Sequence, residues 1–109
     1  MMTVTGYEIP NEMLKKYLSG LVNQFFKILP IKESGEPSLN EFIRSLQREL
    51  IGNKGLMESL ANDSMYLSLI AILQYLIDEE PETAVVRSDV FKAISICKKL
   101  SKKYCDEGV

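Results

Sequence analysis

The chain has 109 residues, of which 46% are apolar and 26% are charged, and its formal net charge is −2. A chain of this length can build one hydrophobic core but not two, so we expect a single domain over residues 1–109, frayed at 1–9 and 106–109. The small negative charge provides no general attraction to nucleic acid or to an anionic membrane. The sequence contains no histidine, which excludes the commonest general base and the commonest metal ligand.

No stretch of the sequence has the pattern of a catalytic, metal-binding or phosphate-binding motif, so we expect neither an enzyme nor a cofactor. The longest apolar run, residues 65–77, is shorter than the ~20 residues that a membrane helix needs. The first ten residues lack the basic start and the apolar run of a secretory signal. Cys97 and Cys105 would lie ~12 Å apart along one helix, too far for a disulfide. We therefore expect a soluble, cytoplasmic protein without membrane contact.

The first predicted helix spans residues 11–29. Pro10 suits a first turn, and apolar residues then recur every three or four positions while polar residues fill the other side. Pro30 is expected to end this helix, with residues 31–37 as a polar loop. Gly20 lies inside the helix and is interpreted as the point of a close helix crossing. The apolar positions are Met13, Leu14, Tyr17, Leu18, Leu21, Val22, Phe25, Ile28 and Leu29.

The second helix is predicted to begin at Ser38, because Ser38 and Glu41 have the spacing of a capping box. Its apolar residues form a narrow stripe, so we place it on the outside of the domain. The sequence Gly-Asn-Lys-Gly at 52–55 is expected to end it, since glycine and asparagine readily adopt the left-handed conformation. Residues 56–61 then predict a short third helix. The stripe consists of Leu39, Phe42, Ile43, Leu46 and Leu50.

Residues 64–78 predict the central helix of the domain, capped at its start by Asp63. In the run 65–77, MYLSLIAILQYLI, only Ser68 and Gln74 are neither apolar nor aromatic. We therefore expect this helix to be covered on most sides. The acidic sequence Asp-Glu-Glu-Pro-Glu at 78–82 follows it. We interpret that sequence as a solvated loop and not as a divalent-cation site, because the spacing and the glycine of a calcium loop are missing.

The last helix carries the candidate binding residues. Residues 81–88 are left open between helix, loop and extended structure, with a helix start favoured at Ser88 and Asp89. The lysines of this helix predict a basic face, which either binds a partner or is a plain solvated surface. The residues expected to be buried are Val90, Phe91, Ile94, Cys97, Leu100 and Tyr104. The candidate partner-binding residues are Lys92, Lys98, Lys99, Lys102 and Lys103.

Together these elements predict an all-α protein, a compact antiparallel bundle of four main helices plus one short helix. The expected function is a small helical interaction or regulatory module that binds a protein partner, or a second copy of itself, through a helix face. A homodimer is favoured over a monomer. The alternative is a nucleic-acid-associated protein that uses the basic face of the C-terminal helix.

Overall fold

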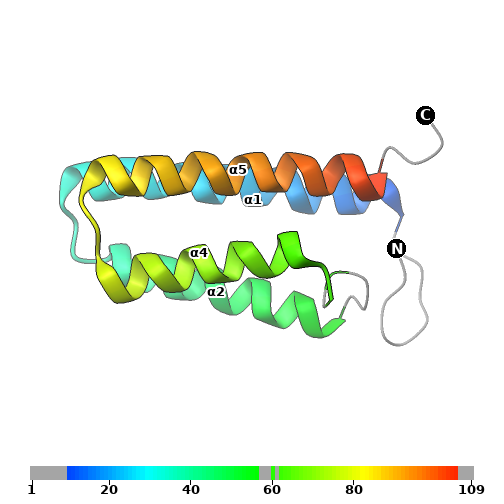
Figure 1. The fold of residues 1–109 in the computed structure, drawn as a ribbon, viewed down its shortest axis with the longest axis horizontal. Coiled ribbons are helices and arrows are strands. Elements are labelled where there is room, and N and C mark those ends of the chain that lie inside the picture. Colours follow the sequence, from blue (N-terminus) through cyan, green and yellow to red (C-terminus); the bar gives the residue numbers. More distant parts are fainter. Residues whose placement is uncertain (1–9, 57–59, 61, 106–109) are drawn as a thin grey trace.

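The computed structural model describes residues 10–56, 60 and 62–105. Within these residues the chain forms four helices and no strand: α1 (Asn11–Ser34), α2 (Leu39–Leu56), α4 (Ser64–Glu79) and α5 (Thr83–Cys105) (Figure 1). The all-α prediction with four main helices is confirmed. The short helix predicted over residues 56–61 falls largely outside the described residues.

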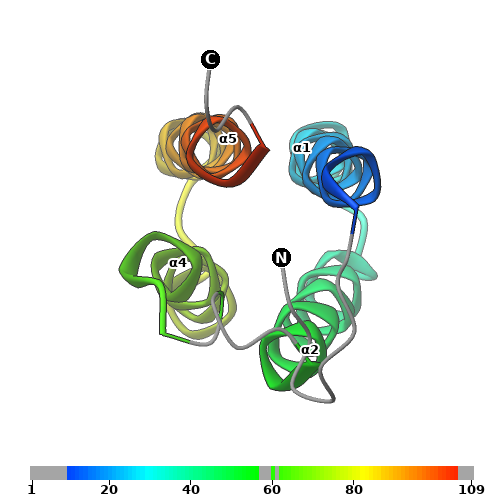
Figure 2. The same cartoon turned by 90° about the vertical axis from the view of Figure 1, so that its right-hand side faces the viewer.

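The four helices form an antiparallel bundle in which each helix runs opposite to its neighbours. Seen along the bundle, they occupy the four corners of a square, with α5 beside α1 and α4 beside α2 (Figure 2). α4 therefore takes a corner like the other three helices, and more of its surface is open than its composition predicts. In the described part of the chain, no helix combines the length and the apolar character that crossing a bilayer requires.

The core lies between the four helices and is built from one apolar stripe of each. Most of the residues that the sequence places on the apolar stripes of α1 and α2 are buried in this core, whereas Met13 of α1 is exposed. Tyr66 of α4 is the largest fully buried side chain. The buried members from α1 and α2 are Leu14, Leu18, Leu21, Phe25, Ile28, Ile43, Leu46 and Leu50. Those from α4 and α5 are Tyr66, Leu69, Leu73, Leu76, Ile77, Val86, Val90, Ala93, Ile94, Cys97 and Leu100.

The predicted end of α1 at Pro30 is wrong, because the helix continues to Ser34. Proline removes the hydrogen bond to the carbonyl of Phe26, but both residues lie on the exposed side of the helix, where water can reach that carbonyl. The helix instead ends at Gly35, whose φ of 70° is left-handed. The amides of Gly35 and Glu36 donate to the last carbonyls of the helix, as in a Schellman motif.

Gly20 does not mark a close helix crossing. A Cβ atom at this position would have no neighbouring heavy atom within 4 Å, apart from the local helix backbone. The glycine is therefore tolerated inside α1, and contact with another helix does not require it. This prediction from the sequence is wrong, because helix propensity alone cannot distinguish a packing glycine from a tolerated one.

The predicted end of α2 at residues 52–55 is also wrong, since the helix continues to Leu56. The helix continues because one of these residues bonds to another helix. The side-chain amide of Asn53 donates to the hydroxyl of Tyr17 on α1 at 3.0 Å, a contact that is made from within the helix. The predicted start is close to the observed one: Ser38 precedes α2, its carbonyl accepts from the amide of Phe42, and its hydroxyl donates to the carboxylate of Glu36.

α5 begins at Thr83, and the start favoured at Ser88 is wrong. The carbonyl of Glu82 accepts from the amides of Val85 and Val86, which forms the first turn directly after Pro81. Val86 is buried one turn before Val90, so the apolar stripe of α5 extends further back than the sequence suggests. Burial of this valine offsets the weak helix propensity of Thr83, Val85 and Val86.

A chain of hydrogen bonds links α1, α2 and α4 inside the bundle. The hydroxyl of Tyr66 donates to the carbonyl of Leu50 at 2.7 Å, which uses its single proton. Tyr17, whose hydroxyl lies 3.2 Å from that of Tyr66, must therefore be the donor in their contact. Tyr17 in turn accepts from Asn53. No buried side-chain nitrogen or oxygen of the described residues lacks a partner. These hydrogen bonds therefore fix the relative positions of the three helices.

Candidate protein-interaction surface

The five candidate lysines of α5 are divided between two sides of the helix. Lys92 lines a groove between α4 and α5, whereas Lys98 lines a groove between α1 and α5. Helical spacing places Lys99 and Lys103 on the side of Lys92, and Lys102 on the side of Lys98. The structure therefore brings three of the candidates together beside α4 and two beside α1.

Lys103 is held in an ion pair with Asp63, the residue that caps α4. Its ammonium lies 2.7 Å from Oδ2 of Asp63, which also accepts a short hydrogen bond from the hydroxyl of Tyr104. The other oxygen, Oδ1, accepts from the amides of Met65 and Tyr66 at 2.8 and 3.3 Å, as the sequence predicts for a helix cap. This cluster fixes the end of α5 against the start of α4.

Burial of Asp63 acts to raise the pKa of its carboxyl, but the bonds from Lys103, Tyr104 and the two amides outweigh this effect. The pKa of Asp63 is therefore lower than its ordinary value. The pKa of the Lys103 ammonium is raised, mainly by its hydrogen bond to Asp63. Of the five candidate lysines, Lys103 consequently has a structural role that the sequence does not separate from binding.

The outward side of α4 is uncharged from Ser64 to Ile77 and carries large apolar side chains. Leu67 and Tyr75 are 38% and 43% exposed, and Ala71, midway between them, is exposed as well. No residue from 64 to 77 is charged. Beside this side runs the groove between α4 and α5, with a volume of about 410 Å³. Its lining consists of Ser68, Ala71, Ile72 and Tyr75 of α4 and Val85, Asp89, Lys92 and Ile96 of α5.

We call this region the α4–α5 face. It consists of Leu67, Ser68, Ala71, Ile72, Tyr75, Val85, Asp89, Lys92 and Ile96. Sequence reasoning missed it because an apolar helix was expected to be buried. The signal that could have revealed it is the absence of any charge over four turns of a helix that needs only one apolar stripe for its core. Exposed apolar regions of this kind are typical of protein contacts.

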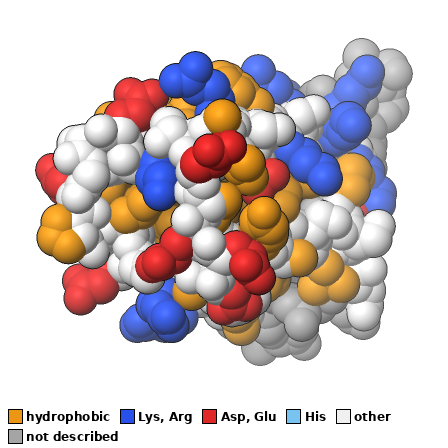
Figure 3. All heavy atoms as spheres, turned by 60° about the vertical axis from the view of Figure 1, so that its left-hand side comes forward, with side chains coloured by type: hydrophobic (Ala, Val, Ile, Leu, Met, Phe, Trp, Pro, Cys, Tyr) orange, Lys and Arg blue, Asp and Glu red, His pale blue; other side chains and the backbone are white. Residues whose placement is uncertain are grey.

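The two ends of the bundle carry opposite charge, and of the lysines at one end, Lys99 and Lys103 lie on the side of α4. The acidic end holds the exposed Asp78, Glu79, Glu80 and Glu82, and Figure 3, which brings this end forward, shows acidic side chains gathered there. The lysine end holds Lys98, Lys99, Lys102 and Lys103, all exposed. The ends are separated by the length of α4 and α5, because these two helices run antiparallel (Figure 1). The bundle is therefore electrostatically polarised along its long axis.

A second groove, of about 300 Å³, lies between α1 and α5. It is lined by Leu18, Ser19, Val22, Asn23, Cys97, Lys98 and Ser101. On these same two helices, the rings of Phe26 and Phe91 meet edge to face, with their centroids 6.1 Å apart. Phe91 is 50% exposed, so its predicted burial is wrong: Val90 and Ile94 face the core, and the ring of Phe91 contacts that of Phe26 at the surface.

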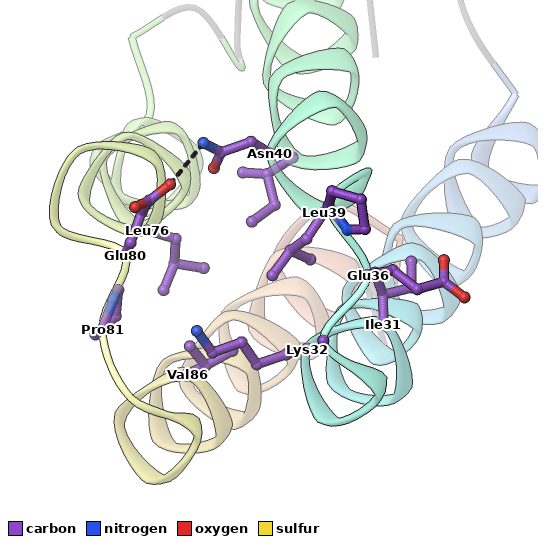
Figure 4. A pocket seen from close by; sticks show the side chains of 12 residues that line it. Ile31, Lys32, Glu36, Leu39, Asn40, Leu76, Glu80, Pro81 and Val86 are labelled. Atoms are coloured by element: carbon purple, nitrogen blue, oxygen red, sulfur yellow. Dashed lines mark hydrogen bonds between the residues drawn. The ribbon is translucent and has the colours of Figure 1, made fainter.

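The third hollow is a cavity of about 320 Å³ at the acidic end, between the α1–α2 and α4–α5 connections (Figure 4). Leu39, Leu76 and Val86 line it, and Lys32 reaches across it. Asn40 donates to the carboxylate of Glu80 at 2.8 Å, joining α2 to the end of α4. Glu80 has a φ of 43°, the left-handed conformation that ends α4. This volume is at the lower limit for ligand pockets, and the bonded pair Asn40 and Glu80 forms part of its polar lining.

Burial raises the pKa of one thiol and two tyrosine hydroxyls in the core. Burial raises the pKa of the Cys97 thiol to about 12, so this sulfur is protonated and a poor nucleophile at neutral pH. Burial also raises the pKa of Tyr66 and of Tyr17. Among the described residues, no three Cys, Asp or Glu side chains are grouped so that they could hold a metal ion. The α4–α5 face is thus the most distinctive surface of the described bundle.

No family model, no curated protein and no solved structure matches this chain. The functional argument therefore depends on the geometry of the bundle and on the chemistry of its surfaces.

Proposed function

We propose that this protein is a non-catalytic helical module that binds protein through the α4–α5 face. The observation that carries the proposal is the uncharged outer side of α4, where Leu67, Ala71 and Tyr75 are exposed along two helical turns. Burying such side chains against a partner is favourable by roughly 25 cal/mol per Å² of apolar surface. Tyrosine is also among the residue types enriched in interfaces, because its ring is apolar and its hydroxyl can be hydrogen-bonded.

Nucleic acid binding through α5 is the alternative. A basic stripe that follows a phosphate backbone needs its charges on one side of the helix. Lys92 and Lys98 instead line different grooves, and Lys103 is paired with Asp63. These placements leave fewer lysines on either side for phosphates and favour a protein partner.

We infer that the protein works in a reducing compartment such as the cytoplasm. Cys97 and Cys105 both belong to α5, where a separation of eight residues places them ~12 Å apart along the axis. A disulfide requires Cα atoms within ~7 Å. The two cysteines therefore cannot bridge each other in the folded helix, and chains without such a bridge are usual where thiols stay reduced.

The test is affinity capture from the native host with the wild-type chain and two variants. Ala71→Glu places a charge at the centre of the α4–α5 face, and Ser19→Glu, the matched control, places one in the α1–α5 groove. We expect at least one bound protein, copies of this chain included, to be lost with Ala71→Glu and kept with Ser19→Glu. Circular dichroism verifies that both variants are folded.

Two outcomes would contradict the proposal. One is the capture of the same proteins by all three chains, because then the α4–α5 face does not contribute to binding. The other is binding to a generic DNA duplex that weakens steeply with salt and is unchanged by Ala71→Glu, which favours the nucleic acid alternative.

A further inference from the structure

The outer side of α4 is symmetric about Ala71 in the size and apolar character of its side chains. Leu67 and Tyr75 each lie four residues from Ala71, one large apolar side chain towards either end of the helix. If two α4 helices cross antiparallel at Ala71, Leu67 of each copy faces Tyr75 of the other. The small side chain of Ala71 lets the two helices approach at the crossing point, and the face is thus complementary to itself.

The charges at the two ends select the same orientation. An antiparallel pair brings the acidic end of one copy (Asp78, Glu79, Glu80 and Glu82) beside the lysine end of the other, at both ends of the interface. A parallel pair would bring the two acidic ends together and the two lysine ends together. Complementary charge of this kind fixes the orientation of an interface more than it adds affinity.

We propose that the α4–α5 face binds a second copy of this chain, in an antiparallel two-fold dimer centred on Ala71. The inference rests on the proposed function, because it names the protein that the face binds. The occupant follows from two independent features of the chain: the placement of Leu67 and Tyr75 about Ala71, and the opposite charges at the two ends.

The dimer is small. α4 has 16 residues and is therefore ~24 Å long, and two packed helices are ~20 Å wide. The resulting contact is below the ~800 Å² per partner of a standard interface. We therefore expect the dimer to form in a concentration-dependent way, so that monomer and dimer are both measurable over about 1 µM to 1 mM.

The experiment reverses the charge of one end at a time and measures mass by sedimentation. The first variant carries Asp78→Lys, Glu79→Lys and Glu82→Lys and keeps Glu80, which is bonded to Asn40, so both of its ends are basic. The second carries Lys98→Glu, Lys99→Glu and Lys102→Glu, so both of its ends are acidic. Lys103 is left unchanged because it holds Asp63. Each variant alone should self-associate at least ~10-fold more weakly than wild type, while a one-to-one mixture of the two should form a heterodimer.

Ala71→Glu gives a second measurement that does not depend on the reversed ends, and Ser19→Glu is its control. The inference is overturned by a wild-type chain that stays at 12.4 kDa throughout this concentration range, by a mixture that does not associate, or by an Ala71→Glu variant that dimerises like wild type. A monomeric wild-type chain whose capture of another protein is sensitive to Ala71→Glu overturns only the dimer. The proposed function fails separately, when neither self-association nor capture depends on this face.

Discussion

Both sides of α4 carry leucine and tyrosine, but the surroundings of these residues are opposite. Leu69 and Leu73 are fully buried in the core, whereas Leu67, two residues before Leu69, is 38% exposed. Tyr66 is fully buried with its hydroxyl bonded to a backbone carbonyl, and Tyr75 is 43% exposed. The apolar content of a helix therefore indicates how much of its surface could be buried. It does not indicate how much of that surface packs against the other helices of the same molecule. The uncovered side is where a partner would bind.

The leucines of α4 give the largest expected difference in stability between its two sides. Leu69→Ala or Leu73→Ala should lower the free energy of unfolding by about 2–5 kcal/mol, the range for a buried leucine that leaves a cavity. Leu67→Ala should change it by less than about 0.5 kcal/mol in dilute monomer, because its side chain remains partly hydrated. Urea denaturation measures all three. Equal effects at Leu67 and Leu69 would show that the two sides of α4 do not differ as described.

The two tyrosines provide the next contrast. Tyr66→Phe deprives the Leu50 carbonyl of its donor and Tyr17 of its acceptor, which should destabilise the fold by about 1–3 kcal/mol. Tyr75→Phe is the matched control and should be close to neutral. Denaturation at pH 7 compares the two variants with wild type, and an unchanged midpoint for Tyr66→Phe would contradict the hydrogen-bond chain.

The same tyrosine predicts a pH dependence. The pKa of Tyr66 is raised in the folded state, mainly by burial, whereas an unfolded tyrosine titrates near about 10. Its contribution to stability is thus complete below pH ~10 and is lost as the pH rises above that value. Wild type should lose stability more steeply than Tyr66→Phe between about pH 9 and 11, with the remaining slope due in part to Tyr17, whose pKa is also raised. Parallel curves would contradict this assignment.

The two aspartates near the ends of α4 give a third contrast between a buried and an exposed residue of the same type. Asp63 is buried and caps the helix, whereas Asp78 is exposed and accepts from Gln74. Asp63→Ala should lower the free energy of unfolding by about 0.5–2 kcal/mol, the usual range for loss of a cap, and Asp78→Ala should lower it less.

The pKa of Asp63 is lowered in the folded state. Its contribution to stability is therefore present above the ordinary pKa of about 4 and is lost as the pH falls below that value.

Stability measured between about pH 5 and 2 should therefore fall less steeply for Asp63→Ala than for wild type. Asp78→Ala serves as the control, because it leaves Asp63 and its partners unchanged. An acid transition in Asp63→Ala as steep as that of wild type would show that this carboxylate does not contribute to acid sensitivity.

The fold was largely predictable because its strongest signals are local. The apolar stripes follow helical spacing, and the Asp63 cap depends on amides only two and three residues away. The helix ends that were missed depend on contacts distant in sequence. Asn53 bonds to Tyr17 of another helix from within residues that look like a helix stop. Likewise Pro30 looks like a stop, but the left-handed residue that ends α1 is Gly35.

The candidate surface was less predictable, because residue type does not reveal what covers a side chain. The lysines of α5 are evident from the sequence, but their division between two grooves depends on where α1 and α4 pack. For the same reason, residue type alone predicts that the exposed side of α4 belongs to the core. An antiparallel bundle does, however, place the end of α5 beside the start of α4, and the Lys103–Asp63 ion pair agrees with that expectation.

The smallest expected effects separate two lysines that are equivalent in the sequence. Surface lysines are usually interchangeable, so the sequence predicts that replacing Lys99 and Lys103 together by glutamate leaves the fold intact. The structure distinguishes them: Lys99 is exposed, whereas Lys103 is bound to the buried carboxylate of Asp63. Lys99→Glu should leave the melting temperature nearly unchanged. Lys103→Glu should lower it, because it places a second carboxylate beside Asp63.

A double-mutant cycle identifies the cause of that loss. If repulsion between the two carboxylates is responsible, Asp63→Asn should remove most of the effect of Lys103→Glu, since asparagine caps a helix about as well as aspartate but carries no charge. Lys99→Glu combined with Asp63→Asn should be additive. Additivity for Lys103 as well would mean that its contact with Asp63 does not stabilise the fold, and Lys103 would then be as available to a partner as Lys99.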